Sequence, residues 1–561
     1  MRKARLERGR GEVSRRYREA VRLSVIGVLC IAVIAGMKAA EWGERRAFGA
    51  NQIMGITLVE DESVLEDKEK LPWGQNPGVC YEEVPLPFDQ EGVLYLAQSP
   101  EEEWTGRLSA AAKSYRLYAP QDGYWEHKQD AIRESHGFVL WLVGEECYYE
   151  MELVVSGMPV VSIQTSRGEE AGRDLEPGEI EDPDIGYFEP DVVYYGTIDV
   201  FNPGVNTGKY EILQSHVRYH HKGATSLVFD KKSYSLSLQD YREQNIDVSL
   251  LGMRRDNKWK LNAMFNDPNR IREMTASQIW EEFDAAYLSV NEAGLRMEYV
   301  ELILDGQYQG IYGLMEPIDE KKLDLDRNDV LYKVCDWMVP TDEEIMVSVE
   351  MQWKLQYPIR IRYPDTISDF AMAWSYVRDY LDTFYRGQEL SYEEFAARVD
   401  LGNIADKQMF VMVTSAEDNF FKNTYLVARV DAQGEYVMYQ VPWDLDMTFG
   451  SKFDGYQPNF RGVEPDHTVE YREQVMDALL EAAPEEVGEF LMDRWGRYRE
   501  SFLATEHILK LMTDNRDYLV ATGAALREQE RWPDEEISMD IEELLDYQTR
   551  RMEWLDGYFG R

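Results

Sequence analysis

The stretch YVELILDGQYQGIYGLMEPI, residues 299–318, carries the clearest fold signal in the chain. Apolar residues alternate with polar ones on both sides of Asp305 and Gly306. An Asp-Gly pair between two such runs is typical of a β-hairpin, because both residues tolerate the positive φ that a tight turn requires. Residues 215–240 are also strand-like, so we expect these segments to share a sheet.

A helix is predicted between those strands. Asp267 fits its N-cap and Pro268 its first helical position, and the run IREMTASQIWEEF (271–283) has apolar residues at helical spacing. Farther along, residues 367–385 and 404–414 are helical in pattern, and Ser391 with Glu394 forms a capping-box signature.

The rest of the chain supports a mixed architecture. A second hairpin is predicted over residues 423–446, and amphipathic helix continues from about residue 466 to residue 561. Residues 41–150 alternate turn-rich stretches with short strand-like runs, which indicates a small β-rich accessory region. We therefore predict the α+β class.

The N-terminus predicts a membrane segment. Residues 1–22 hold nine Arg or Lys against three Asp or Glu, and an uncharged run, LSVIGVLCIAVIAGM (23–37), follows. We interpret residues 1–22 as a basic cytoplasmic tail and residues 23–40 as a transmembrane signal anchor, with the remaining chain outside the membrane. Ala39 and Ala40 also fit a signal-peptidase site, which would give a secreted protein.

Charge limits the class of partner. The chain has a net charge of -44, and the excess of basic residues in its first 22 positions leaves -50 on the rest. Such a surface repels nucleic acid and favours divalent cations or basic proteins. Of the four cysteines, Cys30 lies in the apolar run, and a disulfide between Cys80 and Cys147 is one option.

Three stretches carry residues suited to phosphoryl transfer, which needs groups that hold phosphates, chelate divalent cations and orient a hydroxyl. The first is HHKGATSLVFDKKSYSLSL (220–238). Gly223 and its small neighbours suit a close backbone approach to phosphate. By strand alternation Lys232 shares the face of Tyr234 and Leu236, so we expect it to point into a covered cleft. The alternative is that both lysines lie on the surface of an edge strand.

The second and third stretches are acidic. In SAEDNFFKNTYLV (415–427), Asp418 and Asn423 have the D-x-x-x-x-N spacing that kinases use for a catalytic aspartate and a metal-binding amide. In VPWDLDMTFG (441–450), Asp444 and Asp446 stand two residues apart in an apolar setting. Two carboxylates there favour a bound divalent cation. Ordinary turn residues are the alternative at each of these positions.

Together these motifs resemble the spore coat protein H (CotH) kinase family. The similarity covers roughly residues 155–555 and includes KKSY, LLGMRRDNKWKLNAMFNDPNRIRE (250–273), the D-x-x-x-x-N spacing and PWDLDMTFG. Lys222 stands where the family usually has Arg before the glycine. The HRD and DFG signatures of ordinary kinases are absent from the sequence.

The resemblance implies an atypical, two-lobed protein kinase that uses ATP with Mg or Mn to phosphorylate serine in secreted or coat-like proteins. Its core would span residues 151–465 and its C-terminal helical part residues 466–561. The implied ATP-binding residues are Lys232, Gly223, Ser226 and Arg272, the implied catalytic residue is Asp418, and the implied metal ligands are Asn423, Asp444 and Asp446.

Two other functions fit the sequence less well. One is a binding or scaffold protein on a kinase fold that has lost its chemistry. The other is a carbohydrate-active enzyme whose paired carboxylates, such as Glu316 with Asp444 or Asp446, flank a glycosidic bond.

Overall fold

The computed structural model describes residues 52–75, 77–101, 103–170, 192–204, 209–223, 227, 229–286, 294–387, 390–454, 457–459, 464–466 and 474–560. They form a mixed α+β protein of two compact units. The smaller unit takes its described residues from Met1–Val84, Gly106–Asp122 and Val139–Glu150, and the larger from Pro85–Thr105, Gly123–Phe138 and Met151–Arg561.

The smaller unit is built from short strands. β2 (Ile56–Val59) pairs with β1 (Gln52–Ile53) and runs parallel to β8 (Arg116–Pro120), and β4 (Val79–Tyr81) pairs with β7 (Leu108–Ala110). Cys80 on β4 and Cys147 are free thiols, so the disulfide suggested above is wrong. The Sγ of Cys147 instead lies 3.5 Å from the Tyr115 hydroxyl.

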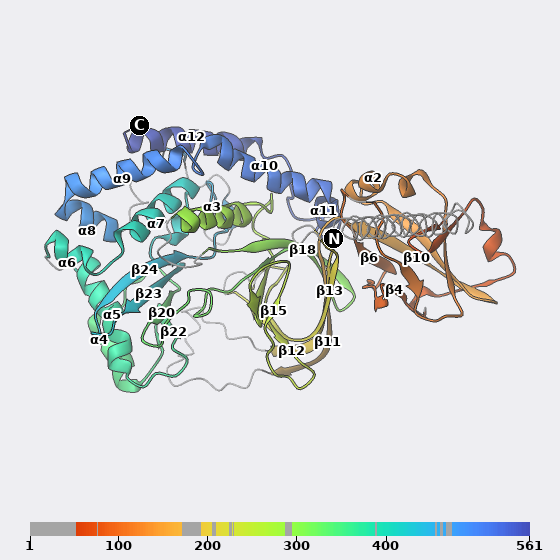
Figure 1. Ribbon diagram of the computed structural model, residues 1–561, viewed down its shortest axis with the longest axis horizontal. Coiled ribbons are helices and arrows are strands. Elements are labelled where there is room, and N and C mark those ends of the chain that lie inside the picture. Colours follow the sequence, from red (N-terminus) through yellow and green to blue (C-terminus); the bar gives the residue numbers. More distant parts are fainter. Residues whose placement is uncertain are drawn as a thin grey trace, which may run out of the picture. The chain divides into compact units, whose positions relative to one another are not determined.

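The larger unit contains a closed β-barrel, with strand order β11-β12-β13-β14-β17-β19-β18 (Figure 1). The strands are β11 (Val160–Glu170), β12 (Val192–Asn202), β13 (Glu211–Lys222), β14 (Ser233–Gln239), β17 (Lys258–Asn262), β18 (Met297–Leu304) and β19 (Gln307–Met315). Neighbours are antiparallel except β11 and β18, which run parallel and close the barrel. Alternate residues such as Leu236, Leu238 and Trp259 fill a buried core.

The Asp305-Gly306 hairpin is confirmed. Asp305 has a φ of 52° and Gly306 a φ of 70°, which suits a type I′ turn between β18 and β19. The predicted helix is confirmed but begins later than expected, since α3 spans Arg272–Ala286. The left-handed φ of Arg270, 58°, interrupts any helix starting at Pro268. The prediction that the helix begins at Asp267 is therefore wrong by about one turn.

A second sheet follows the barrel, in the order β21-β22-β20-β23-β24. Its strands are β20 (Val330–Val334), β21 (Leu355–Gln356), β22 (Ile359–Tyr363), β23 (Thr424–Val430) and β24 (Tyr436–Pro442). The predicted hairpin over residues 423–446 is confirmed as β23 and β24. The short pairs β15 (Val248–Ser249) with β16 (Arg255–Asp256) and β25 (Lys452–Asp454) with β26 (Gln457–Asn459) lie outside these two sheets.

The larger unit also contains the helices that follow β20 in the chain. They are α4 (Asp342–Met351), α5 (Phe370–Phe384), α6 (Tyr392–Ala396), α7 (Leu401–Thr414), α8 (Gln474–Ala482), α9 (Pro484–Arg499), α10 (Thr505–Ala521), α11 (Ala524–Arg531) and α12 (Glu542–Tyr558). α7 lies against β24, α3 against α7 and α10, and α11 against β19 of the barrel. The predicted capping box of Ser391 and Glu394 starts α6.

Among the residues that the structure describes, no helix is both long enough and apolar enough to cross a membrane. The segment expected to be an anchor, residues 23–40, lies outside the described residues, as does the basic tail of residues 1–22.

Candidate functional site

Asp418 and Asn423 come together directly after α7. The helix ends at Ser415, whose φ of 53° is left-handed, and a 3-10 turn then carries Asp418. The side-chain amide of Asn423 donates to Asp418 Oδ2 at 2.9 Å, and the Lys422 ammonium donates to the same oxygen at 2.7 Å. The D-x-x-x-x-N spacing thus produces a direct contact between the two predicted residues.

Asn419 joins this turn to the next acidic stretch. Its buried side-chain amide donates to the carbonyl of Asn423 at 3.1 Å and to that of Trp443 at 2.8 Å, while the Trp443 N–H donates back to the Asn423 carbonyl at 3.0 Å. The sequence analysis missed this residue, because an Asn inside an acidic turn carries no distinct signal.

Asp444 and Asp446 lie on the segment that follows β24. Asp444 has a left-handed φ of 61°, as Asn423 does at 53°; Asn and Asp tolerate this conformation better than most residues. Burial raises the pKa of Asp446 to about 7, and the neighbouring Asp444 adds to the rise. Asp446 Oδ2 accepts a hydrogen bond of 2.6 Å from Asn266.

These three aspartates influence one another, and we call Asp418, Asp444 and Asp446 the acid cluster. Burial raises the pKa of Asp418, the Lys422 ammonium opposes that rise, and Asp444 adds to it. Mutual repulsion between carboxylates is relieved by a cation. In the part of the chain described here, no group of three or more His, Cys, Asp or Glu side chains is arranged to hold a metal ion.

Lys260 and Lys333 interact electrostatically with Asp444, and Lys222 interacts with both of these lysines. Lys222 ends β13, Lys260 lies on β17 and Lys333 on β20. The Nζ atoms of Lys260 and Lys333 lie 5.4 Å and 3.6 Å from the centre of the Trp443 ring. We call these three residues the lysine cluster.

The lysine cluster concentrates positive charge. Burial lowers the pKa of Lys260 well below its ordinary value, and the charges of Lys222 and Lys333 lower it further. Burial also lowers the pKa of Lys333, to about 8. Cations held this close repel each other, and a polyanion would relieve the repulsion. Sequence reasoning missed both Lys260 and Lys333. Lys333 is an isolated charge within the apolar strand VLYKV, which could have marked it, whereas Lys260 shares the strand KWKLN with Lys258 and carries no such signal.

Glu273 lies in the first turn of α3 and interacts electrostatically with both clusters. Burial raises its pKa to about 8; Lys222 and Lys260 oppose the rise, and Asp444 and Asp446 increase it. The side-chain amide of Asn262 donates to its carboxyl group. This residue was also missed, since nothing in the sequence distinguishes it from the other acids of α3.

The predicted ATP-binding lysine lies elsewhere than expected. Lys232 precedes β14, and its ammonium donates to the carbonyls of Leu227, at 2.7 Å, and of Phe229. Lys231 is the fully buried lysine of the pair, with 1% exposure, and ion-pairs with Glu528 at 2.7 Å. The alternation argument fails here because the strand begins only at Ser233.

The other three predicted ATP-binding residues are Gly223, Arg272 and Ser226. Gly223 is exposed at the end of β13, with a φ of 113° that L-residues rarely adopt. Arg272 is buried, and its guanidinium donates to the side chains of Asp267 and Asn269 within the loop that precedes α3. Ser226 lies outside the described residues.

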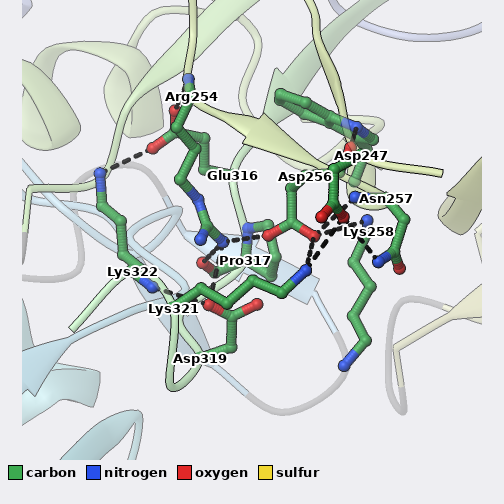
Figure 2. A network of polar contacts seen from close by, with 11 residues as sticks. Asp247, Arg254, Asp256, Asn257, Lys258, Glu316, Pro317, Asp319, Lys321 and Lys322 are labelled. Atoms are coloured by element: carbon green, nitrogen blue, oxygen red, sulfur yellow. Dashed lines mark hydrogen bonds and ion pairs between the residues drawn. The ribbon is translucent and has the colours of Figure 1, made fainter. Parts of the chain in front are cut away.

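Glu316 belongs to a different polar network, shown in Figure 2. One of its carboxylate oxygens accepts from the Arg254 N–H at 2.8 Å and the other from the Lys322 ammonium at 2.6 Å. Arg254 also pairs with Asp256 and Asp319. The network fixes the segment between β19 and β20, and both oxygens of Glu316 are engaged in it. A glycosidase role for Glu316 finds no support in this arrangement.

Comparison with known proteins identifies the family. No curated protein matches the chain. A family model described as CotH kinase protein matches residues 219–555, a range that contains both the acid cluster and the lysine cluster. Because the match covers more than half of the sequence, the chain belongs to the CotH kinase family, and its function is of the kinase type.

Proposed function

We propose that this protein transfers phosphate from ATP, bound with Mg²⁺ or Mn²⁺, to serine hydroxyls of proteins outside the cytoplasm. The observation that carries the proposal is the pairing of the lysine cluster with the acid cluster around Trp443. A nucleoside triphosphate complexed with a divalent cation needs positive groups for its phosphates and oxygen ligands for its metal ion. These two kinds of group must lie close to one another.

Each group would have a separate task. The lysine cluster would bind phosphate oxygens, with Gly223 allowing close backbone approach. Asp418 would accept the proton of the acceptor hydroxyl, and the hydrogen bonds from Lys422 and Asn423 to its Oδ2 would orient the carboxylate. Lys232, whose ammonium holds the loop of Leu227 and Phe229, would act on the phosphate side through that loop.

The donor set fits a hard divalent cation. Asn423, Asp444 and Asp446 offer amide and carboxylate oxygens, and Mg²⁺ is commonly held by one or two carboxylates together with substrate phosphates. When bound, such an ion would neutralise charge on the phosphates.

The fold arrangement suits a two-lobed kinase. In this proposal the closed barrel is the β-rich lobe, and the second sheet with α3–α12 is the helix-rich lobe. Residues 23–40 would anchor the chain in the membrane with residues 41–561 outside the cytoplasm, or a secreted form would result if that segment were cleaved. The acidic surface favours serine-containing basic proteins as substrates over nucleic acid.

The test is labelling by the full-length chain with γ-labelled ATP and Mn²⁺, using a basic serine peptide and following self-labelling. We expect Asp418→Asn and Asp444→Asn to lower the rate by about a hundredfold or more. Asp493→Asn, an exposed acid on α9, is the matched control and should label as the wild type does. Mass spectrometry identifies the modified residue as serine or another hydroxyl.

Two results would contradict the proposal. Equal labelling by wild type and both site variants would refute the assignment of Asp418 and Asp444. Nucleotide-dependent stabilisation of the wild type, without transfer to any acceptor, would instead favour the scaffold function.

A further inference from the structure

Glu528 on α11 is a buried carboxylate that reaches the barrel. Its Oε1 accepts from the Lys231 ammonium at 2.7 Å and from Arg270 Nε at 2.9 Å, and its Oε2 accepts from the Ile311 N–H at 2.7 Å. The side chains of Glu528 and Lys231 are 0% exposed and that of Arg270 is 1% exposed. One anion thus balances two cations away from water.

The backbone of the barrel makes room for this carboxylate. Gly310 has a φ of 91°, and a Cβ built on it would lie 1.8 Å from Glu528 Oε2. Only glycine tolerates this positive φ and also leaves room for the carboxylate, so the contact between α11 and β19 depends on Gly310.

Arg270 carries the contact onward into the loop before α3. While Nε pairs with Glu528, Nη1 donates to the carbonyls of Phe265, at 3.1 Å, and of Asp267. The carboxylate of Asp267 accepts in turn from the N–H groups of Ile271, at 2.7 Å, and Arg272, at 2.8 Å. The loop is therefore held at both ends.

Asn266 lies between the two carbonyls that Arg270 binds. Its side-chain amide donates to Asp446 Oδ2 at 2.6 Å. A continuous series of contacts therefore runs from Glu528 through Arg270 and the loop to Asn266, and from there to an aspartate of the acid cluster.

We infer that Glu528 and Asn266 are positioning residues, which orient Asp446 so that its other carboxylate oxygen is available to a divalent cation. The inference rests on the proposed function, in which Asp446 is a metal ligand. Residues that hydrogen-bond a metal ligand commonly change metal affinity by 10–100-fold when removed. Both residues would act on the metal through Asp446.

The experiment compares Mn²⁺ binding by calorimetry in the full-length wild type, Asn266→Ala and Glu528→Gln. We expect both variants to bind Mn²⁺ at least about tenfold more weakly. The double variant should be no weaker than the poorer single variant, because both changes interrupt the same series of contacts. Excess Mn²⁺ should restore phosphoryl transfer in both, which loss of folded protein would not allow.

Glu301→Gln is the matched control. Glu301 is fully buried and pairs with Arg527, the residue next to Glu528, at 2.7 Å and 2.9 Å, but its contacts lead to Tyr308 rather than to the loop of Asn266. We expect this change to lower the unfolding temperature and leave Mn²⁺ affinity unaltered. If Glu528→Gln does not fold, the Mn²⁺ affinity of Asn266→Ala tests the inference on its own.

The failure of this inference can be distinguished from the failure of the proposed kinase function. Wild-type Mn²⁺ affinity in Asn266→Ala overturns the inference and leaves the kinase proposal intact. An equal loss of Mn²⁺ affinity in Glu301→Gln also overturns it, since general destabilisation would then be the cause. A wild type that binds neither Mn²⁺ nor nucleotide overturns both.

Discussion

At the scale of single residues, the lysine cluster has opposite effects in the empty and the nucleotide-bound protein. The charge of Lys222 lowers the pKa of both Lys260 and Lys333, and the charge of Lys333 lowers the pKa of Lys260, so these charges repel in the absence of an anion. Three phosphate groups would turn that repulsion into attraction. Removing one lysine should therefore harm binding without harming the fold.

We predict that Lys260→Met weakens ATP binding by about 1.5–3 kcal/mol, roughly tenfold to a hundredfold in the dissociation constant. The unfolding temperature without nucleotide should stay the same or rise, because a repelling charge is lost. Thermal unfolding with and without ATP and Mn²⁺ measures both effects. Lys258→Met, an exposed lysine on the same strand, is the control and should change neither. Destabilised empty protein with normal ATP affinity would contradict the prediction.

Glu273 predicts a pH dependence of stability. Its pKa is about 8 in the folded protein and 4.5 ordinarily, so between these values the folded state keeps a proton that the unfolded state has released. The free energy of unfolding must then fall as pH rises, by about 1.4 kcal/mol per pH unit from this group. This loss of stability is absent below about pH 4.5 and is complete above about pH 8.

Glu273→Gln should remove that slope and make the protein more stable than the wild type at pH 8. Urea unfolding at several values between pH 5.5 and pH 8.5 provides the comparison. Glu530→Gln, an exposed acid, should keep the wild-type slope. The prediction is wrong if the slopes of the wild type and Glu273→Gln coincide.

At the scale of helices and strands, buried ion pairs join elements that are distant in sequence. Asp406 on α7 accepts two hydrogen bonds from Arg494 on α9, of 2.6 Å and 2.5 Å. α7 leads directly into the turn that carries Asp418, so this pair fixes the helix that precedes the acid cluster. Both side chains are nearly inaccessible to water.

We predict that Asp406→Asn lowers the free energy of unfolding by about 3–5 kcal/mol, since Arg494 would remain buried without its anion. Replacing both residues by leucine should cost less than Asp406→Asn or Arg494→Leu alone, because no unpaired charge is then left. Urea unfolding of the three variants tests this. An additive loss in the double variant would show that packing, not charge, dominates the contact.

Local signals made several elements predictable. Asp305 and Gly306 need only their own backbone angles to form a hairpin, and Ser391 with Glu394 caps its helix through residues three apart. The start of α3 was mispredicted because the left-handed Arg270 is held by Glu528, which lies 258 residues away. No local pattern contains that information.

The candidate site shows the same division between local and long-range information. Asp418 and Asn423 are five residues apart, so their contact followed from spacing. Lys260, Lys333 and Glu273 come from separate strands and a helix, and only the barrel and the second sheet bring them near Asp444. The direction of the Lys232 side chain was mispredicted because alternation was extended beyond the start of β14.

At the scale of the whole molecule, residues 1–40 predict where the protein resides. We expect the full-length chain to remain with membranes after alkaline extraction, and a chain lacking residues 1–40 to be released into solution. Mass spectrometry of the native N-terminus separates the two possibilities. A mature chain beginning near Ala40 would favour a cleaved signal peptide, and a freely soluble chain with an intact N-terminus would contradict both.

The 297 residues between Lys231 and Glu528 have a consequence for synthesis. At roughly 5–20 residues per second, the ribosome needs about 15–60 seconds to pass from one to the other. During that interval Lys231 and Arg270 have no anion, so the barrel cannot enclose them at low cost. Although its strands lie in the middle of the chain, the barrel therefore completes its packing only when the last helices emerge, and a translation product that stops short of α11 should be a ready substrate for quality-control proteases.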